Sequence, residues 1–157
     1  MNNNSETFMH KAIRLSMESV ENGGGPFGAV IVKDGIEIAS GSNSVTLLND
    51  PTAHAEVTAI RKAAEKLKTF DLTGCVIYTS CEPCPMCLSA IYWARIDKIY
   101  FANTKADARN IGFDDSFIYD QLALPEDERK IPVVSMMRDE ALKVFRIWDK
   151  KEDKREY

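Results

Sequence analysis

The chain has 157 residues, of which 45% are apolar and 28% charged, as expected for one globular domain that buries its own core. Its 24 acidic side chains exceed its 20 basic ones, and the formal net charge of −4 argues against a polyanionic nucleic-acid substrate. The polar N-terminus lacks the apolar segment of a secretory signal, and stretches such as Leu88 to Ala94 are too short to span a bilayer. We therefore expect a single domain over residues 1–157 in the cytoplasm.

The first predicted element is a helix over Glu6 to Val20, where apolar residues recur on one broad face. Three glycines and a proline at residues 23–26 end it. Strands are predicted over Phe27 to Val32 and over Ile36 to Ser40. The Asp34-Gly35 pair between them is typical of a two-residue hairpin turn.

The middle of the chain alternates helices and strands. Asp50-Pro51 resembles an N-cap followed by proline at the first helical position, and it predicts a helix to about Lys66. A strand over Cys75 to Ser80, a helix over Cys84 to Ala94 and a strand over Lys98 to Ala102 follow. This order predicts an α/β fold, with a sheet covered by helices on both faces.

The pattern weakens towards the C-terminus. We expect a short helix at Ile118 to Leu122, an edge strand at Val133 to Met136 and a helix over Glu140 to Trp148. Lys150 to Tyr157 form a densely charged tail.

Two motifs about thirty residues apart carry metal chemistry: His54-Ala55-Glu56 and Pro83-Cys84-Pro85-Met86-Cys87. They supply one imidazole, two thiolates and one spare carboxylate. Zn²⁺ with three protein ligands keeps one tetrahedral corner open for water, whose pKa it lowers to about 7. A carboxylate beside that corner can carry protons, and the joint spacing H-x-E and P-C-x-x-C is typical of zinc-dependent nucleobase deaminases.

Both motifs are expected at helix starts, where the partial positive charge favours thiolates. A closed structural zinc held by His54, Cys81, Cys84 and Cys87 is the alternative, because Cys81 and Cys84 also have C-x-x-C spacing. That alternative leaves Glu56 without a role.

Three segments resemble the cytidine deaminase superfamily, closest to its purine-base and tRNA-adenosine branches. They are Gly25 to Val30, Asn49 to Glu56 and Tyr78 to Cys87. The stretch Ile111 to Tyr119 and the ending Lys-Arg-Glu-Tyr are similar to the bacterial guanine deaminases.

The resemblance implies a three-layer α/β/α sandwich with a five-stranded mixed sheet, one zinc per subunit and a homodimer. It also implies that the C-terminal segment is exchanged between subunits, so that the tail over 150–157 covers the partner's site. Carried over residue by residue, His54, Cys84 and Cys87 are the zinc ligands and Glu56 is the proton shuttle.

The same resemblance assigns the base-binding residues. Asn43 hydrogen-bonds the base, Phe27 stacks on it, and the backbone N–H of Ala55 faces the group that is attacked. Asp115 recognises the guanine edge and assists proton transfer, and Tyr157 closes the pocket. Considered without the resemblance, either aspartate at 114–115 could equally cap a helix, and a chain terminus such as Tyr157 is ordinarily disordered.

The expected activity is hydrolytic deamination of guanine to xanthine and ammonia. A deaminase of the same superfamily that acts on guanosine, cytosine or tRNA adenosine is the first alternative, and a non-catalytic zinc module is the second.

Overall fold

The computed structural model describes residues 3–157, which separate into two compact units. One unit ends at Asp115 and the other consists of Ser116–Tyr157. The single domain expected from the chain length therefore stays a prediction. None of the helices formed by the described residues combines the length and apolar character that crossing a bilayer requires.

The first unit is built on a mixed sheet with strand order β2-β1-β3-β4. Its strands are β1 (Gly28–Lys33), β2 (Ile36–Ser42), β3 (Cys75–Cys81) and β4 (Lys98–Asn103). β1 pairs antiparallel with both β2 and β3, whereas β3 and β4 are parallel. Asp34 and Gly35 both have positive φ, 51° and 75°, as the predicted hairpin turn requires.

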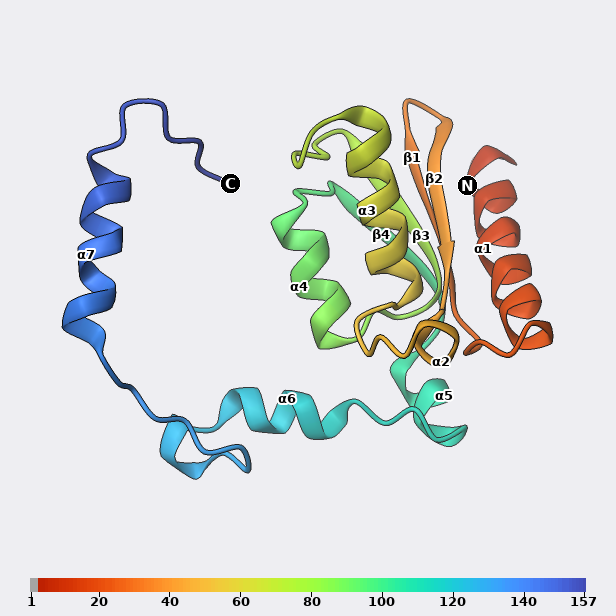
Figure 1. Ribbon diagram of the computed structural model, residues 1–157. Helices are drawn as coiled ribbons and strands as arrows, with labels where there is room; N and C mark the ends of the chain where they lie inside the picture. The colour runs from red at the N-terminus through yellow and green to blue at the C-terminus, as the bar shows by residue number, and fades with distance from the viewer. Residues whose placement is uncertain (1–2) are drawn as a thin grey trace. The chain divides into compact units, whose positions relative to one another are not determined.

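Helices cover both faces of this sheet (Figure 1). Helix α1 (Asn3–Glu21) packs on one face, and α3 (Ala55–Leu67) and α4 (Pro85–Trp93) pack on the other. The side chains of β1 alternate between the two layers, as the pleat of a strand dictates. Ala29 and Ile31 join the α3 and α4 side, while Val30 and Val32 join the α1 side.

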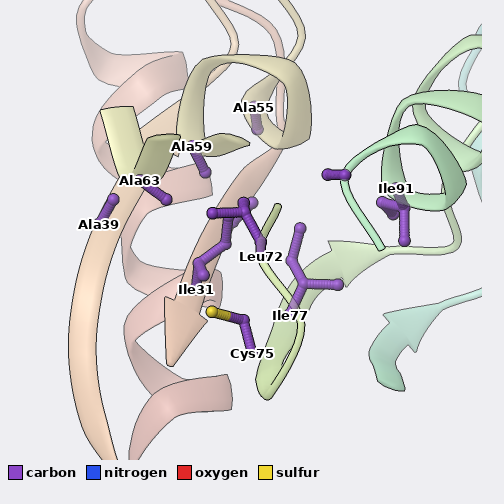
Figure 2. Close-up of a cluster of buried hydrophobic side chains, with 11 residues drawn as sticks. Ile31, Ala39, Ala55, Ala59, Ala63, Leu72, Cys75, Ile77 and Ile91 are labelled. Atoms are coloured by element: carbon purple, nitrogen blue, oxygen red, sulfur yellow. The ribbon is translucent and has the colours of Figure 1, made fainter. Parts of the chain in front are cut away.

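The core between the sheet and α3 sets the position of that helix (Figure 2). Ala55, Ala59 and Ala63 are fully buried along one side of α3 and contribute only methyl groups, which lets the helix lie close to the strands. On β2, a Cβ at Gly41 would come within 2.6 Å of the Ala55 carbonyl oxygen. Small residues on both elements therefore hold the start of α3 against the sheet.

The predicted start of α3 is wrong by several residues. Asp50 Oδ1 accepts hydrogen bonds from the backbone N–H and the hydroxyl of Thr52, at 2.8 and 2.7 Å. This is an Asx turn, which uses the same side-chain chemistry as an N-cap. The helix begins only at Ala55, and His54 is its N-cap.

The sequence pattern did not predict two short helices of the first unit, α2 (Val45–Leu48) and α5 (Lys105–Asn110). Both are too short to show the repeating apolar pattern of a helix. Thr104 and Asp107 form a reciprocal capping box at the start of α5.

The second unit contains α6 (Ser116–Ala123), the 3-10 turn η1 (Glu126–Glu128) and α7 (Arg138–Asp149). Both α-helices lie where the sequence predicts them. The edge strand expected at Val133 to Met136 is wrong for this structure, because these residues form no strand. A strand requires a neighbour for its ladder, and the sheet of the described residues has four strands instead of the expected five.

Candidate active site

The residues of the two metal motifs lie at the starts of α3 and α4. His54 is the N-cap of α3 and Cys84 the N-cap of α4, each with an extended backbone (φ −69° and −67°). Pro85 occupies the first turn of α4, where a missing N–H costs nothing. This places Cys87 one turn into the helix, on the side of Cys84.

The three expected ligand atoms converge. His54 Nδ1 lies 3.5 Å from both Cys84 Sγ and Cys87 Sγ. Zn–N and Zn–S bonds of about 2.1 and 2.3 Å at a tetrahedral angle would separate nitrogen and sulfur by about 3.6 Å. The donor set and its spacing therefore fit zinc.

Cys81 does not join this group. Among the described residues, the cluster able to hold a metal consists of His54, Cys84 and Cys87. Cys81 is buried on β3, its Sγ lies 3.7 Å from the carbonyl oxygen of Thr104, and burial raises its pKa to about 11. The geometry gives a cluster of three ligands without Cys81 and disfavours the closed four-ligand alternative.

Glu56 lies beside the cluster without belonging to it. Its side chain is only 7% exposed, and Oε2 lies 3.4 Å from Cys87 Sγ. Burial raises the pKa of this carboxyl, because a low-dielectric surrounding disfavours the charged form. A carboxyl group that can hold a proton thus adjoins the metal cluster at Cys87.

The two cysteines of the cluster differ in the pKa of their thiols. The Cys87 thiol hydrogen-bonds to Cys84, which lowers the pKa of Cys84 to about 4 and raises that of Cys87. The hydrogen bond to the Cys84 thiolate in turn raises the pKa of His54. Zinc would bind the thiolate and neutral imidazole forms, so metal binding would displace to solvent the protons that these groups hold.

Phe27 directly precedes β1 and Asn43 directly follows β2, and the Asn43 N–H donates to the Phe27 carbonyl oxygen at 3.0 Å. Asn43 is 6% exposed, and its Oδ1 accepts hydrogen bonds from the backbone N–H groups of Gly25 and Val45, both at 3.3 Å. The Phe27 ring meets Phe113 edge to face, with centroids 4.9 Å apart. Ala55, the first residue of α3, is fully buried.

The two adjacent aspartates differ in their surroundings. Asp114 is exposed and pairs with Arg109, whose Nε lies 3.1 Å from Asp114 Oδ1. Asp115 is half-buried, and its pKa is raised by burial and then by the negative charge of Cys84. Tyr157 belongs to the second unit, where its side chain is 72% exposed.

Sequence reasoning missed a contact made by Glu82. Its Oε2 accepts a hydrogen bond from the backbone N–H of Lys105 at 3.0 Å, and its own N–H donates to the Asn103 carbonyl at 2.8 Å. Glu82 therefore ties the segment that leads to Cys84 to the start of α5. No local sequence pattern around Glu82 indicates this contact, because the contact joins residues 23 positions apart.

A three-layer α/β unit with a histidine and two cysteines at helix starts, beside a buried glutamate, defines a zinc-dependent hydrolytic deaminase fold. Residues 2–103 match the model of the cytidine and deoxycytidylate deaminase zinc-binding region. The chain belongs to the cytidine and deoxycytidylate deaminase family, and His54, Cys84 and Cys87 are its zinc triad.

The chain is similar to relatives of two kinds. It is 55% identical to the guanine deaminase of Bacillus subtilis (strain 168) over 155 residues, which cover 98% of this chain and 99% of the relative. It is 45% identical to the tRNA-specific adenosine deaminase of Aquifex aeolicus (strain VF5), over 62% of this chain and 64% of the relative.

Solved structures of guanine deaminases are also similar to this chain. The X-ray structure of the Bacillus subtilis guanine deaminase superposes with a TM-score of 0.95 at 54% identity, covering 100% of this chain and 99% of that one. A guanine deaminase from Nitrosomonas europaea gives a TM-score of 0.68 at 31% identity, covering 90% of this chain and 82% of that one.

Proposed function

We propose that this protein hydrolyses guanine to xanthine and ammonia. The observation that carries the choice of substrate is the likeness to a guanine deaminase over 98% of the chain, including the region beyond residue 103 that lies outside the family match. The likeness to the Aquifex tRNA-specific adenosine deaminase covers only 62% of the chain. The net charge of −4 also disfavours an RNA substrate.

Three residues of the site would bind the metal, and Glu56 transfers the protons. His54, Cys84 and Cys87 would hold zinc, which when bound would supply an activated water as the nucleophile. Glu56 accepts a proton from the attacking water and delivers it to a ring nitrogen of the base. It then passes the second proton of the water to the departing amino group, which leaves as ammonia while the carbonyl of xanthine forms. The raised pKa of Glu56 suits this relay, because the carboxyl must both accept and release protons near neutral pH.

The base would be held by residues on three sides. Phe27 stacks on its face, and the Phe27 ring also makes an edge-to-face contact with Phe113. Asn43 hydrogen-bonds the base edge, and the Ala55 N–H, at the positive end of α3, faces the group that is attacked. Asp115 accepts hydrogen bonds from the N–H groups of guanine, and its carboxylate would reject a base that lacks them.

We further propose a homodimer that exchanges its C-terminal segment, with Tyr157 closing the partner's site. Two features support this assembly. β4 is an edge of the four-stranded sheet, so a fifth strand could pair there, and the segment Val133 to Met136, which is apolar except at Ser135, is not engaged in a strand. On α7, Val144, Phe145, Ile147 and Trp148 are exposed, as expected for a helix whose partner surface lies on another chain.

The test is ammonia release by the purified, zinc-loaded protein from guanine, guanosine, cytosine, adenine and a tRNA anticodon stem that contains adenosine. We expect turnover of guanine with xanthine as the product. Preference for guanosine or tRNA would retain the chemistry of His54, Glu56, Cys84 and Cys87 and overturn the assignment of the base. Bound zinc without turnover of any substrate would favour a non-catalytic zinc module.

A further inference from the structure

We propose that Ser19, on α1, is a positioning residue of the base-binding site, where it holds Asn43 so that the amide NH₂ group faces the ligand. This inference rests on the proposed function and names a residue that lies 24 positions from Asn43 in the sequence.

The amide of Asn43 has its two ends in different environments. Oδ1 accepts two backbone hydrogen bonds, from Gly25 and from Val45. These bonds fix which end is oxygen, because backbone N–H groups can only donate. Nδ2 is the end left to a ligand, so Asn43 can donate to a carbonyl oxygen or an unprotonated ring nitrogen. The site thereby selects a base that presents an acceptor at this edge.

The backbone of Asn43 is held by Ser19 and by Phe27. Ser19 Oγ donates to the Asn43 carbonyl oxygen at 3.0 Å, and the serine is 5% exposed. The Asn43 N–H donates to the carbonyl oxygen of Phe27 at 3.0 Å. Ser19 therefore anchors to α1 the residue that carries the Asn43 amide.

Gly24 closes over this hydrogen bond. A Cβ at Gly24 would lie 2.4 Å from Ser19 Oγ and 2.5 Å from the Asn43 carbonyl oxygen, so only hydrogen fits there. The Gly24 N–H also donates to the Ser19 carbonyl at 2.7 Å. Gly24 is not among the glycines with positive φ, which are Gly23, Gly35, Gly74 and Gly112. A substitution at Gly24 thus acts through contact with Ser19 and Asn43, without strain in its own backbone.

Ser19→Ala removes the hydroxyl that donates a hydrogen bond to the Asn43 carbonyl oxygen. We expect KM for guanine and Kd for xanthine, measured by calorimetry, to rise about tenfold, the effect of one buried hydrogen bond. We expect kcat to change less than about twofold and zinc content to stay the same, because Ser19 touches neither Glu56 nor the triad. Ser16→Ala is the matched control, since the Ser16 hydroxyl bonds only within α1, to the Ile13 carbonyl at 2.7 Å.

Two further variants separate positioning from general destabilisation. Gly24→Ala should reproduce the rise in KM and Kd by displacing the same hydrogen bond. In an Asn43→Ala background, Ser19→Ala should add little to the Kd for xanthine, because the amide that it positions is already gone. An equal effect of Ser19→Ala with and without Asn43, or unchanged KM and Kd in a folded Ser19→Ala protein, overturns the inference. Failure of the wild-type protein to deaminate any base overturns the proposed function instead, and the role of Ser19 with it.

Discussion

His54 and Cys84 occupy the same position in their helices: each is the N-cap residue, and His54 Nδ1 lies 3.5 Å from Cys84 Sγ. The two helix starts therefore meet at the metal cluster, with their partial positive charge directed towards it. This arrangement stabilises thiolate ligands and places the first turn of α3, with Ala55 and Glu56, next to the metal cluster. The site is thus a consequence of where two helices begin.

Glu56→Gln should retain zinc and lose turnover. The amide has the size of the carboxyl but cannot carry a proton, and general acid–base catalysis contributes about 10²–10⁴-fold. Ammonia release and zinc content, measured on the same sample, provide the check. Glu65→Gln, an exposed position on the same helix, is the control and should behave as wild type. A Glu56→Gln protein with wild-type turnover would remove Glu56 from the mechanism.

Cys81→Ser should keep both zinc and activity, because Cys81 faces the Thr104 carbonyl and lies outside the metal cluster. Serine retains a donor for that carbonyl. Cys84→Ser is the comparison, and it should lose zinc and turnover together, since it removes one of three ligands. Metal analysis after dialysis distinguishes the two variants. Loss of zinc from Cys81→Ser would restore the closed structural site as the correct description.

Much of the fold and the metal site followed from local sequence. Asp34-Gly35 predicted the hairpin because few dipeptides tolerate positive φ at both positions. The zinc triad could be predicted because the ligand types and their spacing in the sequence are specific to a metal site. Local chemistry was misleading at Asp50, since an Asx turn and an N-cap both use an aspartate oxygen to accept a nearby backbone N–H.

The remainder depends on contacts between distant residues. Phe27 meets Phe113 across 86 positions, and Ser19 meets Asn43 across 24. Such pairs are set by how α1 and the loops pack on the sheet, which no periodicity in one segment encodes. The number of strands is likewise a property of neighbours, because Val133 to Met136 can form a strand only where another edge is offered.

Asp115→Asn should reduce kcat/KM for guanine by about 10- to 100-fold, the value of a charge-assisted hydrogen bond. Asparagine caps helices nearly as well as aspartate, so a purely structural role at this position would survive the change. Asp114→Asn is the control, because Asp114 is exposed and pairs with Arg109, and surface pairs of this kind contribute little. Equal kinetics in the two variants would reassign Asp115 to a structural role.

Removal of Lys154 to Tyr157 should impair turnover while zinc stays bound. Within these residues, Lys154 Nζ lies 3.1 Å from Asp149 Oδ1 at the end of α7, an ion pair whose aspartate is 82% exposed, so its loss should cost little stability. If Tyr157 closes the pocket, its loss admits water and raises KM for guanine. Tyr157→Phe, which keeps the ring and removes the hydroxyl, should retain more activity than Tyr157→Ala. Steady-state kinetics with zinc analysis on all three proteins decides the matter: identical kinetics in the truncated and full-length chains would exclude any role for the tail in the reaction.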